Sequence, residues 1–340
     1  MTSLPTSRRL LLRPVQETTV DIGPLELDSG EKLRAVRQRV TIDGTPCANG
    51  ENVVFAAHAL TGSSRVADWW PGIVGDGALF DRNHWCVVGV NVLGGCYGST
   101  ALRQAQDDTI VSDDLPLRVT VRDIVNAERR AFDALGIERI GVVIGGSLGG
   151  MQALQWALDA PERVGHAIVI GAHDHHSAMG IALNAVQREA IALDPVRGVA
   201  LARKIAMLTY KSDDLFRERH DRKADRMGSE RFDVEGYLDR QGEKFVNRMD
   251  GATYTTLTHA MDSFDVRDRV RRPGPDLTFV GISSDWLFRP QDVRNAAERF
   301  DARYLELRSN HGHDAFLAEG DKLHALLAPV IAGSDFSLSS

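Results

Sequence analysis

The sequence predicts an α/β protein with a mostly parallel sheet, and two observations support this fold class. First, short runs rich in Val and Ile alternate with amphipathic helical patterns between residues 52 and 171, and the alternation returns from residue 276. Such alternation is typical of a parallel sheet with helices on both faces. Second, the strand-like run 140–146 meets a helical run at the glycine-rich turn Gly145-Gly-Ser147-Leu-Gly149.

The composition is that of an ordinary globular protein. The chain has 340 residues, 43% hydrophobic and 26% charged, which suits one large α/β domain or two smaller ones. A net charge of −7 gives no general attraction to nucleic acid. No run approaches the roughly 18 apolar residues of a membrane span, and the first 14 residues lack the apolar core of a signal peptide. Three cysteines without repeated spacing favour a reducing compartment, so we expect a cytoplasmic protein.

The first 135 residues are expected to form a β-hairpin, two buried strands and one amphipathic helix. Alternating apolar and polar residues predict a β-hairpin, and two continuous apolar runs predict buried strands. An amphipathic pattern then predicts a helix that directs Ile124 and Phe132 to the core. The predicted hairpin strands are 18–22 and 33–42, the buried strands 52–57 and 85–91, and the helix 117–135.

The turn around Ser147 fits the pattern G-x-S-x-G. β-branched residues precede it, and the next ten residues are good helix formers, with Met151, Leu154 and Leu158 on one face. A strand, a sharp turn and a helix are the context that a nucleophile elbow requires, because the turn projects the serine hydroxyl above the sheet. Ser147 is therefore the candidate nucleophile.

Between residues 172 and 265 the alternation stops, and helical patterns follow one another without a strand. We expect a helical lid of residues 172–265, inserted into a core of residues 16–171 and 266–332. The predicted lid helices are 177–192, 197–210, 217–227, 234–250 and 252–264, and the core resumes with strands 276–282 and 303–307 and helices 290–299 and 314–332.

An elbow serine needs a base and an acid that orients it, and these follow it in the chain in the order Asp or Glu, then His. Asp285 follows the strand 276–282, and His313 follows the last strand. His311 is a rival base that the spacing alone does not exclude. The oxyanion would bind the backbone N–H of Leu148 and that of Leu60, in the loop after strand 52–57.

Three other groups carry possible chemistry. The cluster His173-Asp-His175-His176 follows a strand and could bind a metal, but histidine clusters of this kind are more often solvated or hydrogen-bonded, and we expect no metal there. The turn 94–98 lacks the Lys-Ser/Thr of a phosphate-binding loop, and we expect it to pack beside the active site. Cys96 has no activating neighbour in the sequence, so a nucleophilic role is not expected.

Six segments together resemble the homoserine O-acetyltransferase family, the methionine-biosynthesis branch of the α/β-hydrolase superfamily. The resemblance extends from about residue 16 to residue 330 and implies an α/β-hydrolase fold. The elbow alone is generic to hydrolases, but the other segments are specific to this family. The segments are 58–62 (HALTG), 91–99 (NVLGGCYGS), 145–154 (GGSLGGMQAL), 237–245 (YLDRQGEKF), 284–288 (SDWLF) and 312–317 (GHDAFL).

The resemblance implies Ser147 as nucleophile, His313 rather than His311 as the base, and Asp285 as the carboxylate that orients His313. It also implies that Arg203 on a lid helix binds the substrate α-carboxylate, that Asp314 binds its ammonium, and that Tyr210 lines the pocket. From the residues alone, Arg203 would be a surface arginine and Asp314 a helix cap. A guanidinium fits a carboxylate bidentately, which suits the role of Arg203.

The implied reaction is a ping-pong transfer of an acetyl group from acetyl-CoA to L-homoserine, with no cofactor. Succinyl-CoA as donor and L-serine as acceptor remain alternatives, as does a serine esterase or hydrolase. The resemblance also implies a homodimer formed through lid helices. The chain departs from the family pattern in two places, a shortened segment between Asp194 and Arg203 and the histidine cluster at 173–176.

Overall fold

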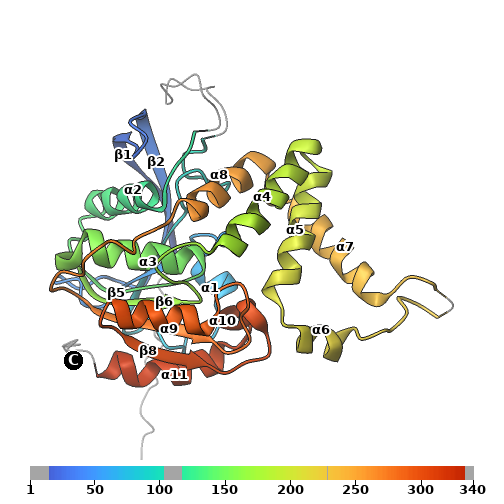
Figure 1. Ribbon diagram of the computed structural model, residues 1–340. Coiled ribbons are helices and arrows are strands. Elements are labelled where there is room, and N and C mark those ends of the chain that lie inside the picture. The colour runs from blue at the N-terminus through green and yellow to red at the C-terminus, as the bar shows by residue number, and fades with distance from the viewer. Residues whose placement is uncertain (1–14, 103–116, 228, 334–340) are drawn as a thin grey trace, which may run out of the picture.

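The computed structural model describes residues 15–102, 117–227 and 229–333 (Figure 1). Within these residues, an eight-stranded sheet has the order β1-β2-β4-β3-β5-β6-β7-β8. The pairs β1·β2 and β2·β4 are antiparallel and all others parallel, so the predicted mostly parallel sheet is confirmed. The strands are β1 (Gln16–Glu26), β2 (Lys32–Asp43), β3 (Val53–Ala57), β4 (Cys86–Val90), β5 (Ile140–Gly146), β6 (Val164–Ile170), β7 (Asp276–Ile282) and β8 (Arg303–Leu307).

Helices cover both faces of the sheet, which explains why the central strands are almost continuously apolar. Along β3, Phe55 joins one core cluster with residues of α2 and α3, whereas Val54 and Ala56 join the second cluster with residues of α1 and α11. The helices are α1 (Val66–Trp69), α2 (Val121–Ala134), α3 (Leu148–Asp159), α4 (Ala178–Leu193), α5 (Arg197–Tyr210), α6 (Asp213–Arg219), α7 (Asp233–Val246), α8 (Gly251–Asp262), α9 (Pro290–Arg299), α10 (Ala315–Ala318) and α11 (Gly320–Ala332), with short 3-10 turns η1 (Pro161–Arg163) and η2 (Gly312–Asp314).

Helix α2 begins at Val121, four residues later than predicted. The hydroxyl of Thr120 accepts a hydrogen bond from the N–H of Asp123 at 3.1 Å, and the Asp123 carboxylate accepts one from the N–H of Thr120 at 2.9 Å. This reciprocal capping box fixes the first turn of the helix. The prediction followed the apolar periodicity, which extends beyond the cap.

The segment between β6 and β7, residues 172–265, contains α4 to α8 and is named here the helical insert. Figure 1 shows α5, α6 and α7 to one side of the sheet. The predicted helix 217–227 is wrong, because the helix in this region is α6 (Asp213–Arg219). Ser212 caps it by accepting from the N–H of Leu215 at 3.1 Å, and Asp221, with φ of 44°, follows its end.

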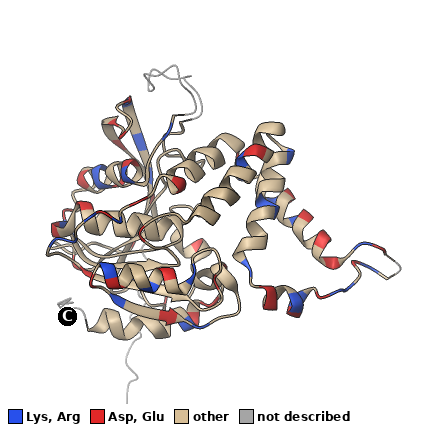
Figure 2. Cartoon of the chain, viewed as in Figure 1, with Lys and Arg blue, Asp and Glu red and all other residues tan. Residues whose placement is uncertain are grey.

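Acidic and basic residues both occur along the insert helices (Figure 2). Lys204 and Arg231 both pair with Asp239, and Arg217 pairs with Asp213 one turn earlier on α6. Such exposed pairs contribute little to stability, about 0–1 kcal/mol each. They therefore indicate a solvated surface rather than a site for a charged partner.

The closing helix predicted at 314–332 is broken in the structure. Helix α10 ends at Ala318, and α11 begins at Gly320 after a bend at Glu319. A Cβ on Gly320 would lie 2.7 Å from the carbonyl oxygen of Pro71, so the chain bends where two backbones meet. None of the helices that the structure describes is long and apolar enough to cross a membrane.

Candidate active site

Ser147 lies between β5 and α3 in a strained backbone conformation. Its φ of 58° and ψ of −124° belong to a region that residues with a side chain rarely adopt. The N–H of Ser147 donates to the carbonyl of Ile170 at the end of β6, at 2.9 Å. Strain of this kind persists where surrounding contacts enforce it, and it is common at functional sites.

The glycines beside Ser147 enforce this turn. A Cβ on Gly145 would overlap the carbonyl oxygen of Gly149, and a Cβ on Gly149 would overlap the carbonyl oxygen of Ala57. Backbone therefore packs directly on backbone where β5, α3 and β3 meet. This arrangement is the nucleophile-elbow geometry that the G-x-S-x-G pattern predicts.

Asp285 and His313 form a buried pair at the ends of β7 and β8. His313 Nδ1 lies 2.7 Å from Asp285 Oδ2, and both residues are at most 3% exposed. The other carboxylate oxygen, Oδ1, accepts from the N–H groups of Leu287 at 2.9 Å and Phe288 at 3.0 Å. Because the carboxylate faces Nδ1, we assign the proton to that nitrogen, which leaves the lone pair on Nε2.

The environment of His313 acts on its charge in opposite directions. Burial lowers its pKa, but the charge of Asp285 and the hydrogen bond to it outweigh burial, so the pKa is raised above 6.5. Among the described residues, Nε2 is buried and has no hydrogen-bond partner. The carboxylate thus holds Nδ1 and leaves Nε2 able to accept a proton, but the described structure shows no hydrogen bond between Nε2 and the Ser147 hydroxyl.

Aromatic rings fix the plane of the His313 imidazole. Phe288 stacks on it with ring centroids 5.2 Å apart and an interplanar angle of 25°. Tyr210 and Phe316 contact other parts of the ring, at 5.7 and 5.8 Å between centroids. Phe316 also fills the space that a side chain on Gly146 would need, so the same ring contacts the elbow and the base. Phe288 was not predicted as a site residue, although the motif 284–288 contains it.

His311, the rival base, has a different environment. Asp285 pairs with His313, and within the described structure the Nδ1 of His311 is buried without a hydrogen-bond partner. Burial lowers the pKa of His311. The geometry therefore favours His313.

Leu148 and Leu60, the predicted oxyanion donors, lie in two segments that contact each other. Leu148 is the first residue of α3, so its N–H has no acceptor within the helix, and Leu60 is buried in the turn after β3. Gln152 donates to the carbonyls of His58 at 3.2 Å and Leu148 at 3.1 Å, which ties the two segments together. The sequence analysis did not identify this role of Gln152, which depends on a contact between distant segments.

Arg203 lies on α5 among aromatic rings. Its guanidinium carbon is 5.1 Å from the centroid of Phe245 and 5.6 Å from that of Tyr210. The structure shows no ion pair between Arg203 and any described residue, so its five donors are not committed to a protein carboxylate. Because Tyr210 contacts both Arg203 and His313, it links the cation on the insert to the base.

Asp314 already has a cationic partner in the structure. Lys211 Nζ lies 2.8 Å from Asp314 Oδ2, and both side chains are less than one-fifth exposed. Burial raises the pKa of the nearby Tyr237 hydroxyl, and the charge of Asp314 adds to this effect. Lys211 directly follows the predicted pocket residue Tyr210, but its pairing with the distant Asp314 gives no signal in the sequence.

The loop that carries His313 packs tightly against the insert. Gly312 has φ of 68°, and a Cβ there would lie 2.7 Å from the backbone nitrogen of Ser212. The hydroxyl of Ser212 donates to the carbonyl of Asn310, and the hydroxyl of Ser284 accepts from the N–H of Gly312 at 2.9 Å. The insert and the base loop therefore share a close backbone contact.

The turn 94–98 lies against the insert. Cys96 Sγ is 3.3 Å from the carbonyl oxygen of Arg248, and Cys96 and Tyr97 line a cavity of about 940 Å³ with residues 191–199 and 246–255. These contacts do not test the prediction that the turn packs beside the active site, which stays a prediction.

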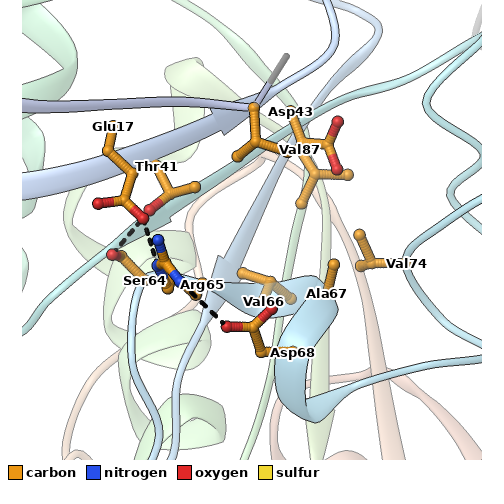
Figure 3. A pocket seen from close by; sticks show the side chains of 11 residues that line it. Glu17, Thr41, Asp43, Ser64, Arg65, Val66, Ala67, Asp68, Val74 and Val87 are labelled. Carbon is orange, nitrogen blue, oxygen red and sulfur yellow. Dashed lines mark hydrogen bonds and ion pairs between the residues drawn. The ribbon is translucent and has the colours of Figure 1, made fainter. Parts of the chain in front are cut away.

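Another cavity, of about 380 Å³, lies between α1 and the antiparallel edge of the sheet (Figure 3). Glu17 pairs there with Arg65, and the hydroxyls of Thr41 and Ser64 are 2.9 Å apart. None of the residues predicted for the active site lines this cavity. It is therefore separate from the elbow.

Comparisons with known proteins agree with this geometry. Residues 52–319 match the family model described as alpha/beta hydrolase fold. A homoserine O-succinyltransferase from Aromatoleum aromaticum is 37% identical over 349 residues, covering 90% of this chain and 93% of the relative. A homoserine O-acetyltransferase from Acidiphilium cryptum is 36% identical, covering 91% and 93%. The solved homoserine O-acetyltransferase from Staphylococcus aureus has a TM-score of 0.77 at 30% identity and covers 94% of each chain. This chain therefore belongs to the α/β-hydrolase-fold family of homoserine O-acetyl- and O-succinyltransferases.

Proposed function

We propose that the protein transfers an acetyl group from acetyl-CoA to the hydroxyl of L-homoserine through an acyl-enzyme on Ser147. The observation that carries this proposal is the Asp285–His313 pair, buried and with an unpaired Nε2, at the same sheet edge as the elbow serine. Membership in a family whose members are named for homoserine acylation supports the choice of acceptor.

The first half-reaction forms the acyl-enzyme. His313 Nε2 takes the proton of the Ser147 hydroxyl while the oxygen attacks the thioester carbon of acetyl-CoA. The N–H groups of Leu148 and Leu60 stabilise the oxyanion of the tetrahedral intermediate. The carbon–sulfur bond then breaks, and CoA leaves as a thiol with the proton that His313 returns.

The second half-reaction transfers the acetyl group. His313 takes the proton of the homoserine hydroxyl, whose oxygen attacks the acetyl carbon. The ester bond to Ser147 breaks, and the proton returns from His313 to the serine oxygen. No cofactor besides the acyl donor takes part in these steps.

The amino-acid substrate would bind through its two charged groups. Arg203, uncommitted to any carboxylate of the described chain, would bind the α-carboxylate bidentately, with Tyr210 beside it. Asp314 would bind the ammonium. Since Lys211 occupies one of the two oxygens of Asp314, the substrate ammonium would share this carboxylate with Lys211.

The helical insert would act as a lid on the core of residues 16–171 and 266–332. A transferase must keep water from the acyl-enzyme, since hydrolysis would waste the acyl group. The close contact of Gly312 with Ser212 supports this role, because it holds the insert against the base loop.

The decisive experiment measures release of the CoA thiol with different donors and acceptors. Acetyl-CoA or succinyl-CoA is combined with homoserine, with serine, or with no amino acid. We expect release with acetyl-CoA to depend on homoserine. Release that ignores the amino acid would identify a serine hydrolase instead, and preference for succinyl-CoA or for serine would change the donor or the acceptor but keep the reaction type.

We also propose a cytoplasmic homodimer that associates through the insert. Large apolar side chains of α4 and α5 and their connection are exposed, among them Leu193 at 83% and Val196 at 62%. Within the described chain the three cysteines form no disulfide, which suits a reducing compartment. Sedimentation of the protein and of Leu193→Glu tests the dimer, which the charged variant should weaken.

A further inference from the structure

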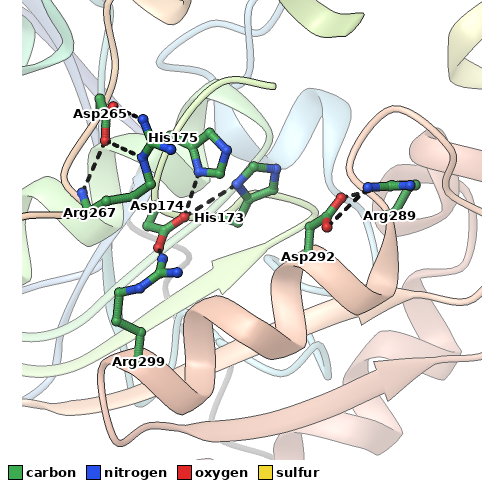
Figure 4. A network of polar contacts seen from close by, with 8 residues as sticks. All are labelled: His173, Asp174, His175, Asp265, Arg267, Arg289, Asp292 and Arg299. Carbon is green, nitrogen blue, oxygen red and sulfur yellow. Dashed lines mark hydrogen bonds and ion pairs between the residues drawn. The ribbon is translucent and has the colours of Figure 1, made fainter. Parts of the chain in front are cut away.

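Three side chains that can bind a metal converge directly after β6. His173, Asp174 and His175 each direct one ligand atom into the same space, and these atoms all lie within 4.8 Å of one another. Asp174 Oδ1 is 2.8 Å from His175 Nδ1 and 3.6 Å from His173 Nδ1 (Figure 4). The two rings lie with centroids 4.6 Å apart.

His173 is the unusual member of this group. It is 1% exposed, and neither ring nitrogen has a hydrogen-bond partner among the described residues. A buried polar group without a partner is destabilising, so such groups call for a missing ligand or a special role.

Against the expectation from the sequence, we propose that His173, Asp174 and His175 bind a divalent transition-metal ion such as Zn²⁺. Imidazole and carboxylate are ligands that zinc accepts at about 2.0–2.2 Å, which places neighbouring ligands of a tetrahedral site about 3.4 Å apart. The 3.6 Å between Asp174 Oδ1 and His173 Nδ1 is close to this value, whereas the 2.8 Å between Asp174 Oδ1 and His175 Nδ1 is a hydrogen bond that a bound ion would replace. Mg²⁺ and Ca²⁺ prefer oxygen ligands alone and do not fit this set. Water would supply the fourth ligand, since the His175 side chain is 31% exposed.

The surrounding charges are compatible with such a site. Arg299 pairs with Oδ2 of Asp174, which orients the carboxylate and leaves Oδ1 directed at the two histidines (Figure 4). Carboxylates that bind metals are commonly held by a second partner in this way. Arg267, the other nearby cation, is paired with Asp265 through two of its nitrogens. The positive charge of Arg299 weakens binding but does not block the ligand atoms.

The position of the cluster suggests what the ion would do. Residues 174–176, near the start of the insert, pair with residues 264–266 at its end. The N–H of Val266 donates to the carbonyl of Asp174, and the N–H of His176 donates to the carbonyl of Phe264. His173 also contacts Phe288, the ring that stacks on His313. A bound ion would therefore stabilise the two connections that join the insert to the sheet.

Zinc binding to the full chain, without a polyhistidine tag and after chelator treatment, tests the proposal. We expect one Zn²⁺ per chain by calorimetry. His175→Ala and Asp174→Asn should each weaken binding by more than the roughly 10–100-fold that loss of an outer-shell partner costs. His84→Ala and Cys47→Ser remove exposed residues that could also bind zinc, and they should change nothing.

Two further measurements keep the proposal decidable if a variant folds poorly. X-ray absorption of the wild-type protein should show two imidazoles and no sulfur around the zinc. The Tm of the wild type should rise with zinc, and that of His175→Ala should not. Absence of stoichiometric binding, unchanged affinity in His175→Ala, or a sulfur ligand would each overturn the proposal, whatever the outcome of the acyl-transfer assay.

Discussion

The elbow and the helical insert position their functional groups by different means. At the elbow, Gly145 and Gly149 allow backbone to meet backbone, and the conformation of Ser147 follows from those contacts. In the insert, Arg203 and Lys211 are long side chains held by rings and by one ion pair. Backbone contacts leave few alternatives, whereas side-chain contacts can be altered one at a time. We therefore expect the chemical step to depend on the rigid region and the choice of substrate to depend on the adjustable one.

Burial shows the same contrast. All residues of β3 and β5 are buried, whereas the insert exposes several large apolar side chains, including Met179, Leu201 and Leu208. Substitutions at the elbow should therefore affect both folding and catalysis. Substitutions in the insert should affect binding or association with little change in stability.

Ser147→Ala tests the rigid region most strongly. Loss of the nucleophile should reduce transfer by about 10⁴–10⁶-fold and abolish the acetyl-enzyme. Mass spectrometry after incubation with acetyl-CoA measures this directly. An acetylated variant would show that the nucleophile lies elsewhere.

Asp285→Asn should reduce kcat/KM by about 10⁴-fold and change its pH dependence. The base acts when neutral, and because Asp285 raises the pKa of His313, wild-type activity should fall below a midpoint above pH 6.5. Without the carboxylate, burial dominates and lowers this pKa, so the acid limb should move to lower pH. The pH–rate profiles of both proteins measure the shift, and an unmoved limb would assign it to another group.

Two glycine substitutions compare the regions directly. Gly149→Ala should lower the free energy of unfolding by about 3 kcal/mol or more, because the new Cβ overlaps the backbone of Ala57. Gly242→Ala on α7 should lower it by less, because its closest contact, the carbonyl oxygen of Ala200, lies at 3.0 Å rather than 2.1 Å and alanine favours the helix. Urea unfolding measures both. Equal losses of stability in the two variants would show that the elbow and the insert do not differ in rigidity.

Glu128 on α2 contacts the elbow helix α3, and its substitution tests the effect of a buried carboxylate in the rigid region. Its carboxylate accepts from Trp156 Nε1 at 2.8 Å, and burial raises its pKa to about 8. A folded-state pKa raised above the unfolded value gives stability that is full below about pH 4.5 and lost as the pH rises to about 8. Glu128→Gln, which mimics the protonated acid, should therefore gain about 2–4 kcal/mol relative to wild type between pH 5 and 8. Urea unfolding of both proteins at pH 5 and pH 8 measures this gain. A stability difference between variant and wild type that is the same at both pH values would contradict the raised pKa of Glu128.

Arg203→Met tests the adjustable region. Loss of charge-assisted hydrogen bonds to the substrate should raise the KM for homoserine by about 10–100-fold. Acetylation of Ser147 by acetyl-CoA should be unchanged, because the described structure shows no contact of Arg203 with Ser147, Asp285 or His313. Arg197→Met, an exposed position on the same helix, is the control. If Arg203→Met slowed acetylation of Ser147 as much as it weakened use of homoserine, Arg203 would instead act by supporting Tyr210 and His313.

The sequence predicted the regions whose structure depends on local patterns. The strands, the elbow and most helices follow from apolar periodicity and from the glycines around Ser147. Errors arose where a distant contact or a cap decides the structure: Ser212 begins α6 earlier than its charge pattern suggests, and Pro71 bends the chain at Gly320. The Lys211–Asp314 pair and the stacking of Phe288 on His313 join residues far apart in the chain, so no local pattern predicts them.

Gly312 has a consequence for how such proteins diversify. Its missing side chain lets the backbone of the base loop rest on that of Ser212 in the insert. Two segments more than 90 residues apart must therefore change together. An insert taken from another α/β hydrolase could not be exchanged as an independent module unless it reproduced this backbone path. Changes of substrate in this scaffold are thus expected to arise by replacing side chains within the insert, and not by replacing the insert itself.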